Sequence, residues 1–388
     1  MKKFIVMILL ITAIKAQALP VKHDSRVLPV KSQKVLETCY SFAAMGACEA
    51  NFMTHNPDSN INLPGDFLIS YAEELFTFPA LELGDEFTAA AILSRLPEFC
   101  GLRLRDVYFM SRHMPFDKDF ISDETRKNLI LANGAIYAGI FVDHRLFERR
   151  GKIVTYFNNS QERRINHDIL ITGWDDNFPL FYFNPRPSKN GAWLVKDSWK
   201  PENSENGYYW IPYEQNIKGG AAFITEKFNP DARIYLHDDL GYCSSIKFSW
   251  AANIFRVRED LEYLNEAAFY TPRNNMSWDI YIYECGKNFP DSPVSGILKS
   301  HISGKFDLAG YHTVEIPEKF SLWQGTYLSV ILKLGAKIMP VETQIINYSD
   351  NAVINANESY FSLDGQKWTD GKNLNSNACI KIFTVIRE

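Results

Sequence analysis

The order of the hydrophobic patterns along the chain constrains its fold most. Patterns of helical period come first, in residues 39–52 and 65–97. From about Asn128 onward the apolar runs become short and rich in β-formers, as in residues 134–143 and 167–174. A helical region followed by a set of strands predicts an α+β domain.

A second domain is predicted beyond a boundary at residues 226–235. The remaining sequence consists of short β-rich runs separated by turn residues, and its helical periodicity is poor. This pattern is typical of an all-β antiparallel sandwich or jelly roll. A chain of 388 residues, 46% of them hydrophobic, is long and apolar enough for two cores. We therefore expect domains at residues 19–228 and 231–388.

The first residues have the pattern of a secretory leader. Lys2 and Lys3 precede the apolar run 4–14, and the sequence Ala-Gln-Ala follows at 16–18. The apolar run is too short to span a bilayer comfortably. We expect residues 1–18 to be a cleaved signal peptide. The product would then be exported, either periplasmic or secreted, without stable membrane insertion.

Charge and cysteine spacing argue against several classes of function. A net charge of −5 at pH 7 is unfavourable for nucleic-acid binding. The six cysteines show no C-x2-C pairing and the histidines no H-x3-H pairing, so we expect no metal site and no cofactor. Two interpretations of Cys48 stay open, a disulfide with Cys100 or a small apolar residue on a helix.

Cys39 is the first candidate for a functional residue. It opens the predicted helix, and Thr38 before it is a suitable N-cap. The unpaired N–H groups and the dipole at a helix start favour a thiolate over a thiol. The segment alone is equally compatible with a buried structural cysteine at a helix start.

A thiolate nucleophile needs a base, and the base needs a group that orients it. His167 opens an apolar strand directly after Asn166, which would hold its ring rigidly. Asp197 ends a later strand, so its carboxylate could accept the imidazole N–H. Trp199, two residues on, could cover that hydrogen bond from water.

Gln33 precedes Cys39 by six residues. Its side-chain amide and the backbone N–H of Cys39 could together form an oxyanion hole. Each element alone is a weak signal. The specific feature is the order: Gln, Cys at a helix start, His at a strand start, Asp-Ser-Trp, and then Gly-Tyr.

Three segments resemble papain-like (C1 family) cysteine peptidases: VKSQKVLETCYSFAAMGACEANF at 30–52, NHDILITGWDDN at 166–177 and GAWLVKDSWKPENSENGYYWIPY at 191–213. The resemblance covers roughly residues 20–225. Residues 231–388 resemble the lectin-like β domain attached to some bacterial C1 peptidases. The resemblance implies a papain-like α+β fold, with a helical and a β-barrel-like subdomain, followed by a β-sandwich.

The resemblance also implies an activity, an exported thiol endopeptidase that acts on proteins or peptides. Cys39 would be the nucleophile, His167 the general base and acid, Asp197 the orienting group and Gln33 the oxyanion donor. The β domain would hold a glycan or protein ligand.

A further set of residues is expected to contact the substrate. Gly84 and Asp85 stand where the family has the Gly-Gly pair that lets a substrate backbone approach closely. Trp199 and Asn166, beside the expected catalytic residues, complete this set.

Several positions depart from the family pattern. Asp197 replaces the usual Asn, although a carboxylate can also accept the imidazole N–H. Glu37 and Thr38 replace Gly-Ser before the nucleophile, and the charge of Glu37 would oppose thiolate formation. Tyr40 replaces a Trp, and Asp168 follows the histidine where a small residue is common.

These departures keep two other interpretations open. One is a binding protein on a catalytically decayed peptidase scaffold, in which the β domain would hold protein or glycan through exposed aromatics. The other is a cell-wall amidase on the related NlpC/P60-type scaffold, which the long match at 191–213 disfavours. Four tryptophans are candidates for such aromatics, or else for the sandwich core: Trp250, Trp278, Trp323 and Trp368.

Overall fold

A computed structural model describes residues 18–25, 29–34, 38–77, 84–110, 121–160, 165–199 and 206–386. The predicted signal peptide lies outside these ranges except for its last residue. Within the described ranges, no helix combines the length and the apolar character needed to cross a membrane.

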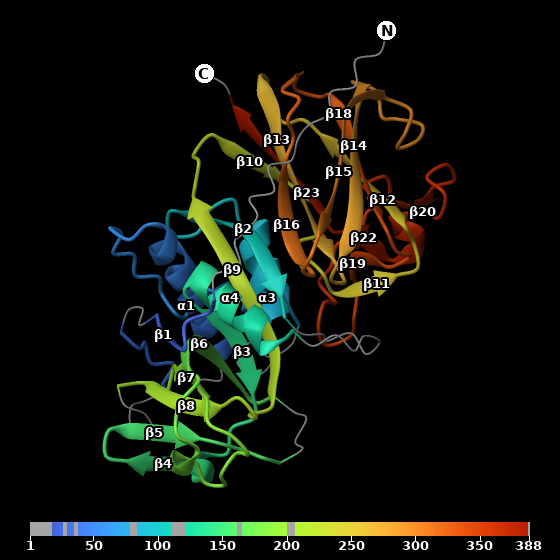
Figure 1. Cartoon of the computed structure of the whole chain (residues 1–388). Coiled ribbons are helices and arrows are strands. Elements are labelled where there is room, and N and C mark those ends of the chain that lie inside the picture. Colours follow the sequence, from blue (N-terminus) through green and yellow to red (C-terminus); the bar gives the residue numbers. More distant parts are fainter. Residues whose placement is uncertain are drawn as a thin grey trace.

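The first half of the chain contains the helices and a group of strands (Figure 1). The helices are α1 (Cys39–His55), α2 (Ile69–Leu75), α3 (Glu86–Arg95) and α4 (Asp123–Asn133), with short 3-10 turns η1 (His144–Leu146) and η2 (Leu180–Tyr182). The strands are β1 (Lys22–Asp24), β2 (Leu102–Phe109), β3 (Ile136–Ile140), β4 (Phe147–Arg150), β5 (Ile153–Tyr156), β6 (His167–Asp175), β7 (Ala192–Lys196), β8 (Tyr208–Pro212) and β9 (Ile217–Lys227).

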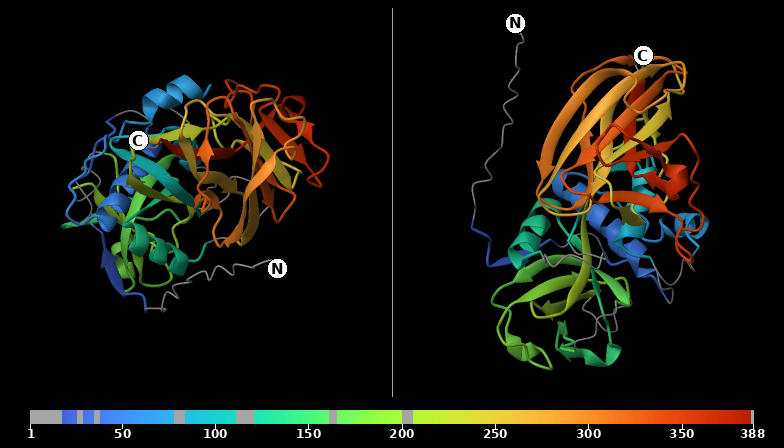
Figure 2. Two further views of the ribbon diagram at one scale, coloured as in Figure 1. Left: turned by 90° about the horizontal axis from the view of Figure 1, so that it is seen from above. Right: turned by 90° about the vertical axis from the view of Figure 1, so that its right-hand side faces the viewer.

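The second half is built from strands. They are β10 (Ala232–Tyr235), β11 (Ser244–Ile246), β12 (Trp250–Arg256), β13 (Glu262–Thr271), β14 (Met276–Gly286), β15 (Ile297–Phe306), β16 (Gly310–Glu315), β17 (Ser321–Leu322), β18 (Tyr327–Leu334), β19 (Met339–Thr343), β20 (Ser359–Ser362), β21 (Thr369–Asp370), β22 (Ser376–Ala378) and β23 (Ile380–Ile386), with a 3-10 turn η4 (Gly371–Leu374). Figure 2 shows these strands as layers beside the helical half.

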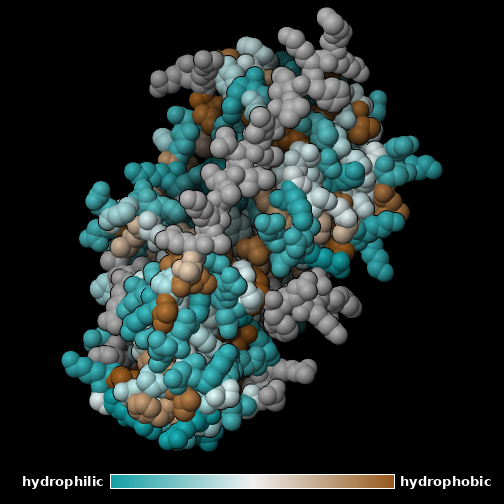
Figure 3. Space-filling model, viewed as in Figure 1, coloured by the Kyte–Doolittle hydropathy of each residue, from teal (hydrophilic) through white to brown (hydrophobic). Residues whose placement is uncertain are grey.

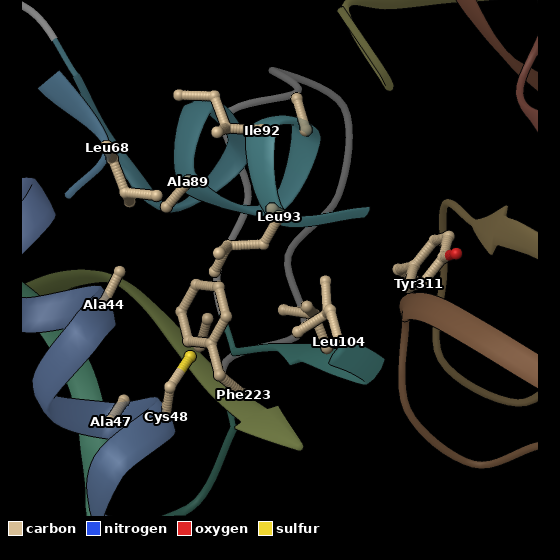
Figure 4. Packing of buried hydrophobic residues seen from close by; sticks show 14 of the residues in the cluster. Ala44, Ala47, Cys48, Leu68, Ala89, Ile92, Leu93, Leu104, Phe223 and Tyr311 are labelled. Atoms are coloured by element: carbon tan, nitrogen blue, oxygen red, sulfur yellow. The ribbon is translucent and has the colours of Figure 1, made fainter. Parts of the chain in front are cut away.

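Helix α1 lies at the centre of the first half. It contacts β6, β9, α3 and α4, and its alanines allow these elements to approach closely. In Figure 4, Cys48 of α1 points toward Phe223 of β9, below Leu93 of α3. The sequence predicted an amphipathic helix, but α1 is buried on almost all sides because elements pack around it.

The structure decides between the two interpretations of Cys48. Cys48 is buried in the core beside α3, whereas Cys100 is exposed, and both are free thiols. Cys48 therefore acts as a small apolar residue, the second of the two interpretations.

One sheet runs through both halves of the molecule. Its strand order is β10-β23-β13-β16-β2-β9-β3-β6-β7-β8-β5-β4. The seam between the halves is the antiparallel pair β16–β2, where Gly310 lies opposite Tyr108. A Cβ at Gly310 would lie 1.9 Å from the carbonyl oxygen of Val107, so only glycine permits this approach.

Buried charges reinforce the seam. Arg103 of β2 donates to Glu266 of β13 at 2.6 Å, and Arg105 lies 3.3 Å from the same carboxylate. Charge-assisted hydrogen bonds of this kind hold two elements in a defined register. The predicted division at residues 228–231 remains a prediction, but the two halves share a continuous sheet.

The second half is the antiparallel sandwich that the sequence predicts. A sheet ordered β15-β14-β18-β12-β20-β21 packs on β13, β16, β17 and β23 around an apolar core. Trp278 belongs to this core, whereas Trp323 is 51% exposed. Trp250 and Trp368 are half-buried. The face seen in Figure 3 is mostly hydrophilic, with scattered apolar residues.

Candidate active site

Cys39 is the first residue of α1 and is 9% exposed. Thr38 precedes it but makes no capping hydrogen bond, and its hydroxyl is buried without a partner among the described residues. The predicted N-cap is therefore wrong as a side-chain interaction. Its backbone angles, φ −113° and ψ 21°, lie outside the extended conformation typical of a capping residue.

His167 is the first residue of β6 and is fully buried. Its Nε2 lies 2.8 Å from Oδ1 of Asp197, directly after β7. Because a carboxylate only accepts hydrogen bonds, Nε2 carries the proton in this pair. The other ring nitrogen, Nδ1, is buried and has no hydrogen-bond partner among the described residues.

Trp199 covers the His167–Asp197 pair. Its ring stacks on the imidazole with centroids 3.7 Å apart and planes inclined by 16°. Oδ1 of Asp197 also accepts from the backbone N–H groups of Ser198 (2.7 Å) and Trp199 (3.2 Å). These donors fix the carboxylate and so fix the imidazole.

Gln33 is buried beside the same turn. Its backbone N–H donates to the carbonyl of Ser198 at 2.8 Å, and its side-chain carbonyl accepts from the Ser198 hydroxyl. Since the carbonyl end of the amide faces Ser198, the amide nitrogen is directed away from that residue. The structure thus joins Gln33 to the segment that carries Asp197 and Trp199.

Asn166 fixes the start of β6. Its side chain accepts from the backbone N–H of Val142 at 2.7 Å and donates to the carbonyl of the same residue at 2.9 Å. This two-point contact ties the residue before His167 to the segment that follows β3. The expected substrate contact of Asn166 stays a prediction, and its side chain has a structural role.

Gly84 and Asp85 lie at the start of α3. A Cβ at Gly84 would lie 2.4 Å from ring carbons of Tyr40, the residue after the nucleophile, so Tyr40 requires glycine there. Oδ1 of Asp85 caps α3, accepting from the N–H groups of Phe87 (3.0 Å) and Thr88 (2.9 Å). The expected substrate contacts of Gly84 and Asp85 remain predictions.

Cys39 contacts Asp168 in the structure. The thiol donates to Oδ2 of Asp168 at 3.5 Å. Burial, and next the charge of Asp168, raise the pKa of the Cys39 thiol well above its usual range. The sequence led us to expect the opposite, since a helix start favours thiolate. Loss of hydration and a neighbouring carboxylate outweigh the helix dipole here.

The sequence identified Asp168 only as a departure from a family pattern, and it missed Glu86 and Tyr137 near it. Successive side chains of a strand point to opposite faces, so the residue after His167 faces the other side of the sheet. This alternation was the signal in the sequence that could have identified Asp168. Among the described residues, no group of three or more His, Cys, Asp or Glu side chains could hold a metal ion.

Two family models match the chain. Residues 106–226, which include His167 and Asp197, match the papain family cysteine protease model. Residues 234–384 match the lectin-like domain model. The chain carries a papain-family cysteine protease domain followed by a lectin-like domain.

The papain-family domain is similar in sequence to cathepsins. A viral cathepsin from Lymantria dispar multicapsid nuclear polyhedrosis virus is 23% identical over 214 residues, 51% of this chain and 54% of the relative. Human cathepsin L2 is 22% identical over 218 residues, 50% of this chain and 60% of the relative. The chain thus spans little more than half the length of these curated relatives.

Solved structures contain both domains together. Clostridial cysteine protease Cwp84 after propeptide cleavage has a TM-score of 0.78 at 24% identity, covering 93% of this chain and 97% of that one. The protease and lectin-like domains of Cwp84, a surface layer associated protein of Clostridium difficile, give 0.77 at 23% identity over 95% and 89%. This likeness confirms the predicted fold, papain-like α+β followed by a lectin-like sandwich.

Proposed function

We propose that the papain-family domain is a thiol endopeptidase that hydrolyses peptide bonds through an acyl-enzyme on Cys39. The observation that carries the proposal is the buried His167–Asp197 pair beneath Trp199. An imidazole held at Nε2 by a carboxylate, with Nδ1 unengaged among the described residues, is suited to general base catalysis.

In the proposed reaction, Nδ1 of His167 takes the thiol proton of Cys39, and the sulfur attacks the substrate carbonyl carbon. The amide of Gln33 and the backbone N–H of Cys39 stabilise the oxyanion. His167 then returns the proton to the leaving amine, which leaves a thioester. Water that gives its proton to the same nitrogen hydrolyses the thioester, and the proton returns to the thiol.

The proposal includes export and a ligand for the lectin-like domain. The leader pattern at residues 1–18 supports a periplasmic or secreted location. The surface-layer association stated for Cwp84 agrees with such a location. Proteins or peptides would be the substrates, and a glycan or protein would bind the lectin-like domain.

A second candidate is a protein- or glycan-binding protein on a catalytically decayed scaffold. The contact between Cys39 and Asp168 favours it, because a thiol hydrogen-bonded to a buried acid is poorly disposed to ionise. This candidate predicts no thiolate on Cys39 at neutral pH and no hydrolysis of peptides.

Labelling with an epoxysuccinyl thiol probe, followed by mass spectrometry and a fluorogenic peptide assay, separates the two candidates. For a peptidase we expect adducts on Cys39, loss of labelling in His167→Ala, and hydrolysis that falls about 1000-fold or more in Cys39→Ser. Cys100→Ser is the matched control, since that thiol is exposed and outside the site. Equal, slow labelling of wild type and His167→Ala, without hydrolysis, would favour the binding protein.

A further inference from the structure

Asp168 lies against the nucleophile, although the proposed reaction does not use it. Oδ2 of Asp168 accepts from the Cys39 thiol at 3.5 Å, and the two residues are 8% and 9% exposed. The contact joins the start of α1 to the second residue of β6. A carboxylate so close to a nucleophilic sulfur, with little water between, acts strongly on the charge of that sulfur.

The pleat of β6 explains why Asp168 faces Cys39. Successive strand residues point to opposite faces, so residues 168 and 170 share one face. Leu170 lies against α1, where a Cβ on Gly46 would be 3.2 Å from its Cδ2. Ile169, on the opposite face, belongs to the core of the β-rich subdomain. Asp168 therefore faces α1, and the side chain of His167, the proposed base, starts from the opposite face of β6.

Several titratable groups face Asp168 from the elements packed around it. They are Cys39 on α1, Asp85 at the N-cap of α3, Glu86 in the first turn of α3, Tyr137 on β3, and Lys31, Glu49, Lys196 and Asp197 around a shared hollow. The charge of Lys31 is already engaged, since its Nζ lies 2.5 Å from Glu49.

The surroundings favour the neutral form of Asp168. Glu86 is 2% exposed, and the N–H of Gly220 holds its carboxylate at 3.0 Å. Burial, and next the charge of Glu86, raise the pKa of Asp168 well above its usual range, while the Tyr137 hydroxyl acts in the opposite direction. Asp168 can therefore gain and lose its proton nearer neutral pH than an ordinary aspartate.

We infer that Asp168 is a positioning residue that controls the ionisation of Cys39, an inference that rests on the proposed function. When ionised, Asp168 holds the thiol proton by its hydrogen bond and repels a thiolate. When protonated, it carries no charge, and the thiol proton can pass to Nδ1 of His167. The reactive sulfur thus requires Asp168 in its neutral form.

Ionisation of Asp168 determines how the reactivity of Cys39 changes with pH. As pH rises through the pKa of Asp168, the carboxylate forms and the Cys39 thiolate becomes less favourable. Reactivity of Cys39 should therefore rise less steeply with pH than that of a cysteine without an acidic neighbour. A cysteine without such a neighbour becomes more reactive as pH rises.

The test is the rate of alkylation by iodoacetamide from about pH 5 to pH 9, with each adduct located by mass spectrometry. Exposed Cys100 in the same molecule is the internal reference. At about pH 8 we expect the Cys39/Cys100 rate ratio to rise about tenfold or more in both Asp168→Asn and Asp168→Ala, which is at least one pKa unit.

Asp175→Asn is the matched control. It makes the same substitution at the other end of β6, where Asp175 pairs with Lys22 on the surface, and the Cys39 profile should not change. A profile of Asp168→Asn within about twofold of wild type would overturn the inference. If both Asp168 variants fail to fold, wild type alone decides, since a Cys39 rate that rises with pH in parallel with Cys100 would also overturn it.

Alkylation requires no peptide substrate, so the two proposals fail separately. Absence of hydrolysis in every variant, with the alkylation profile as expected, would overturn the peptidase and leave the role of Asp168 intact. Peptide hydrolysis with unchanged alkylation profiles in the Asp168 variants would support the peptidase and overturn the role of Asp168.

Discussion

The imidazole of His167 and the carboxylate of Asp197 lie 2.8 Å apart, and both residues are buried, with Trp199 stacked over the ring. Three donors converge on one oxygen of Asp197: Nε2 of His167 and the backbone N–H groups of Ser198 and Trp199. The position of the imidazole is thus determined by the short segment after β7.

Asp197→Asn should retain peptidase activity, with kcat/KM within about tenfold of wild type. The three donors at Oδ1 would select the amide orientation that places its carbonyl oxygen there, so the acceptor for His167 is preserved. Asp197→Ala removes the acceptor and should lower kcat/KM about 100-fold or more. Steady-state kinetics check this, and equal losses for both variants would contradict it.

Trp199→Ala should lower kcat/KM roughly tenfold, because water would enter above the His167–Asp197 hydrogen bond and weaken it. Trp199→Phe should lose less, since a smaller aromatic ring can still cover the imidazole. The control is Trp323→Ala on the exposed surface of the other half, which should leave kinetics unchanged. A Trp199→Ala enzyme with wild-type kinetics would mean that the ring does not shield the pair.

Gly310→Ala should destabilise the protein by about 1 to 3 kcal/mol. The added methyl would meet the backbone carbonyl of Val107 at 1.9 Å, and backbone in a paired strand cannot move aside cheaply. Urea unfolding measures the change. Gly46→Ala in α1 is the contrast, because its nearest neighbour is the flexible end of Leu170 at 3.2 Å, and it should be much milder.

Glu342 should make the stability of the sandwich depend on pH. Burial raises its pKa from an ordinary value of 4.5 to about 8, against hydrogen bonds from Leu240 and Asn377. A folded-state pKa above the unfolded one means that the native protein holds the proton more tightly. The free energy of unfolding should therefore fall as pH rises between these two values, by up to about 1.4 kcal/mol per unit.

The substitution Glu342→Gln removes the titrating proton, so it should flatten this dependence. Urea unfolding at several pH values between about 5 and 8 provides the measurement. The prediction fails if the slopes of wild type and Glu342→Gln coincide.

Much of the fold could be predicted from the sequence because its signals are local. The helical pattern from Cys39, the strand from His167 and the short runs after 235 each follow from the spacing of apolar residues over a few positions. The seam between β2 and β16 could not be predicted in this way. It joins Tyr108 to Gly310, and no local pattern indicates which strands pair across such a distance.

The candidate site was likewise predictable from the sequence only in part. Order along the chain was enough to bring His167, Asp197 and Trp199 together, and the structure places them in contact. The partner of Cys39 was not foreseen, because it depends on which face of β6 lies against α1. The ionisation of the thiol was misjudged for the same reason, since burial and a carboxylate are tertiary effects.

The shared sheet has a consequence for how such a protein would work once attached. A flexible linker would let a catalytic domain adopt many orientations relative to the domain that is bound. Here the pairing of β2 with β16 and the ion pair of Arg103 with Glu266 fix the orientation of the sandwich relative to the first half. If the proposed ligand holds the lectin-like domain, it also sets the direction in which Cys39 faces, and only substrates that approach from that side would be within reach.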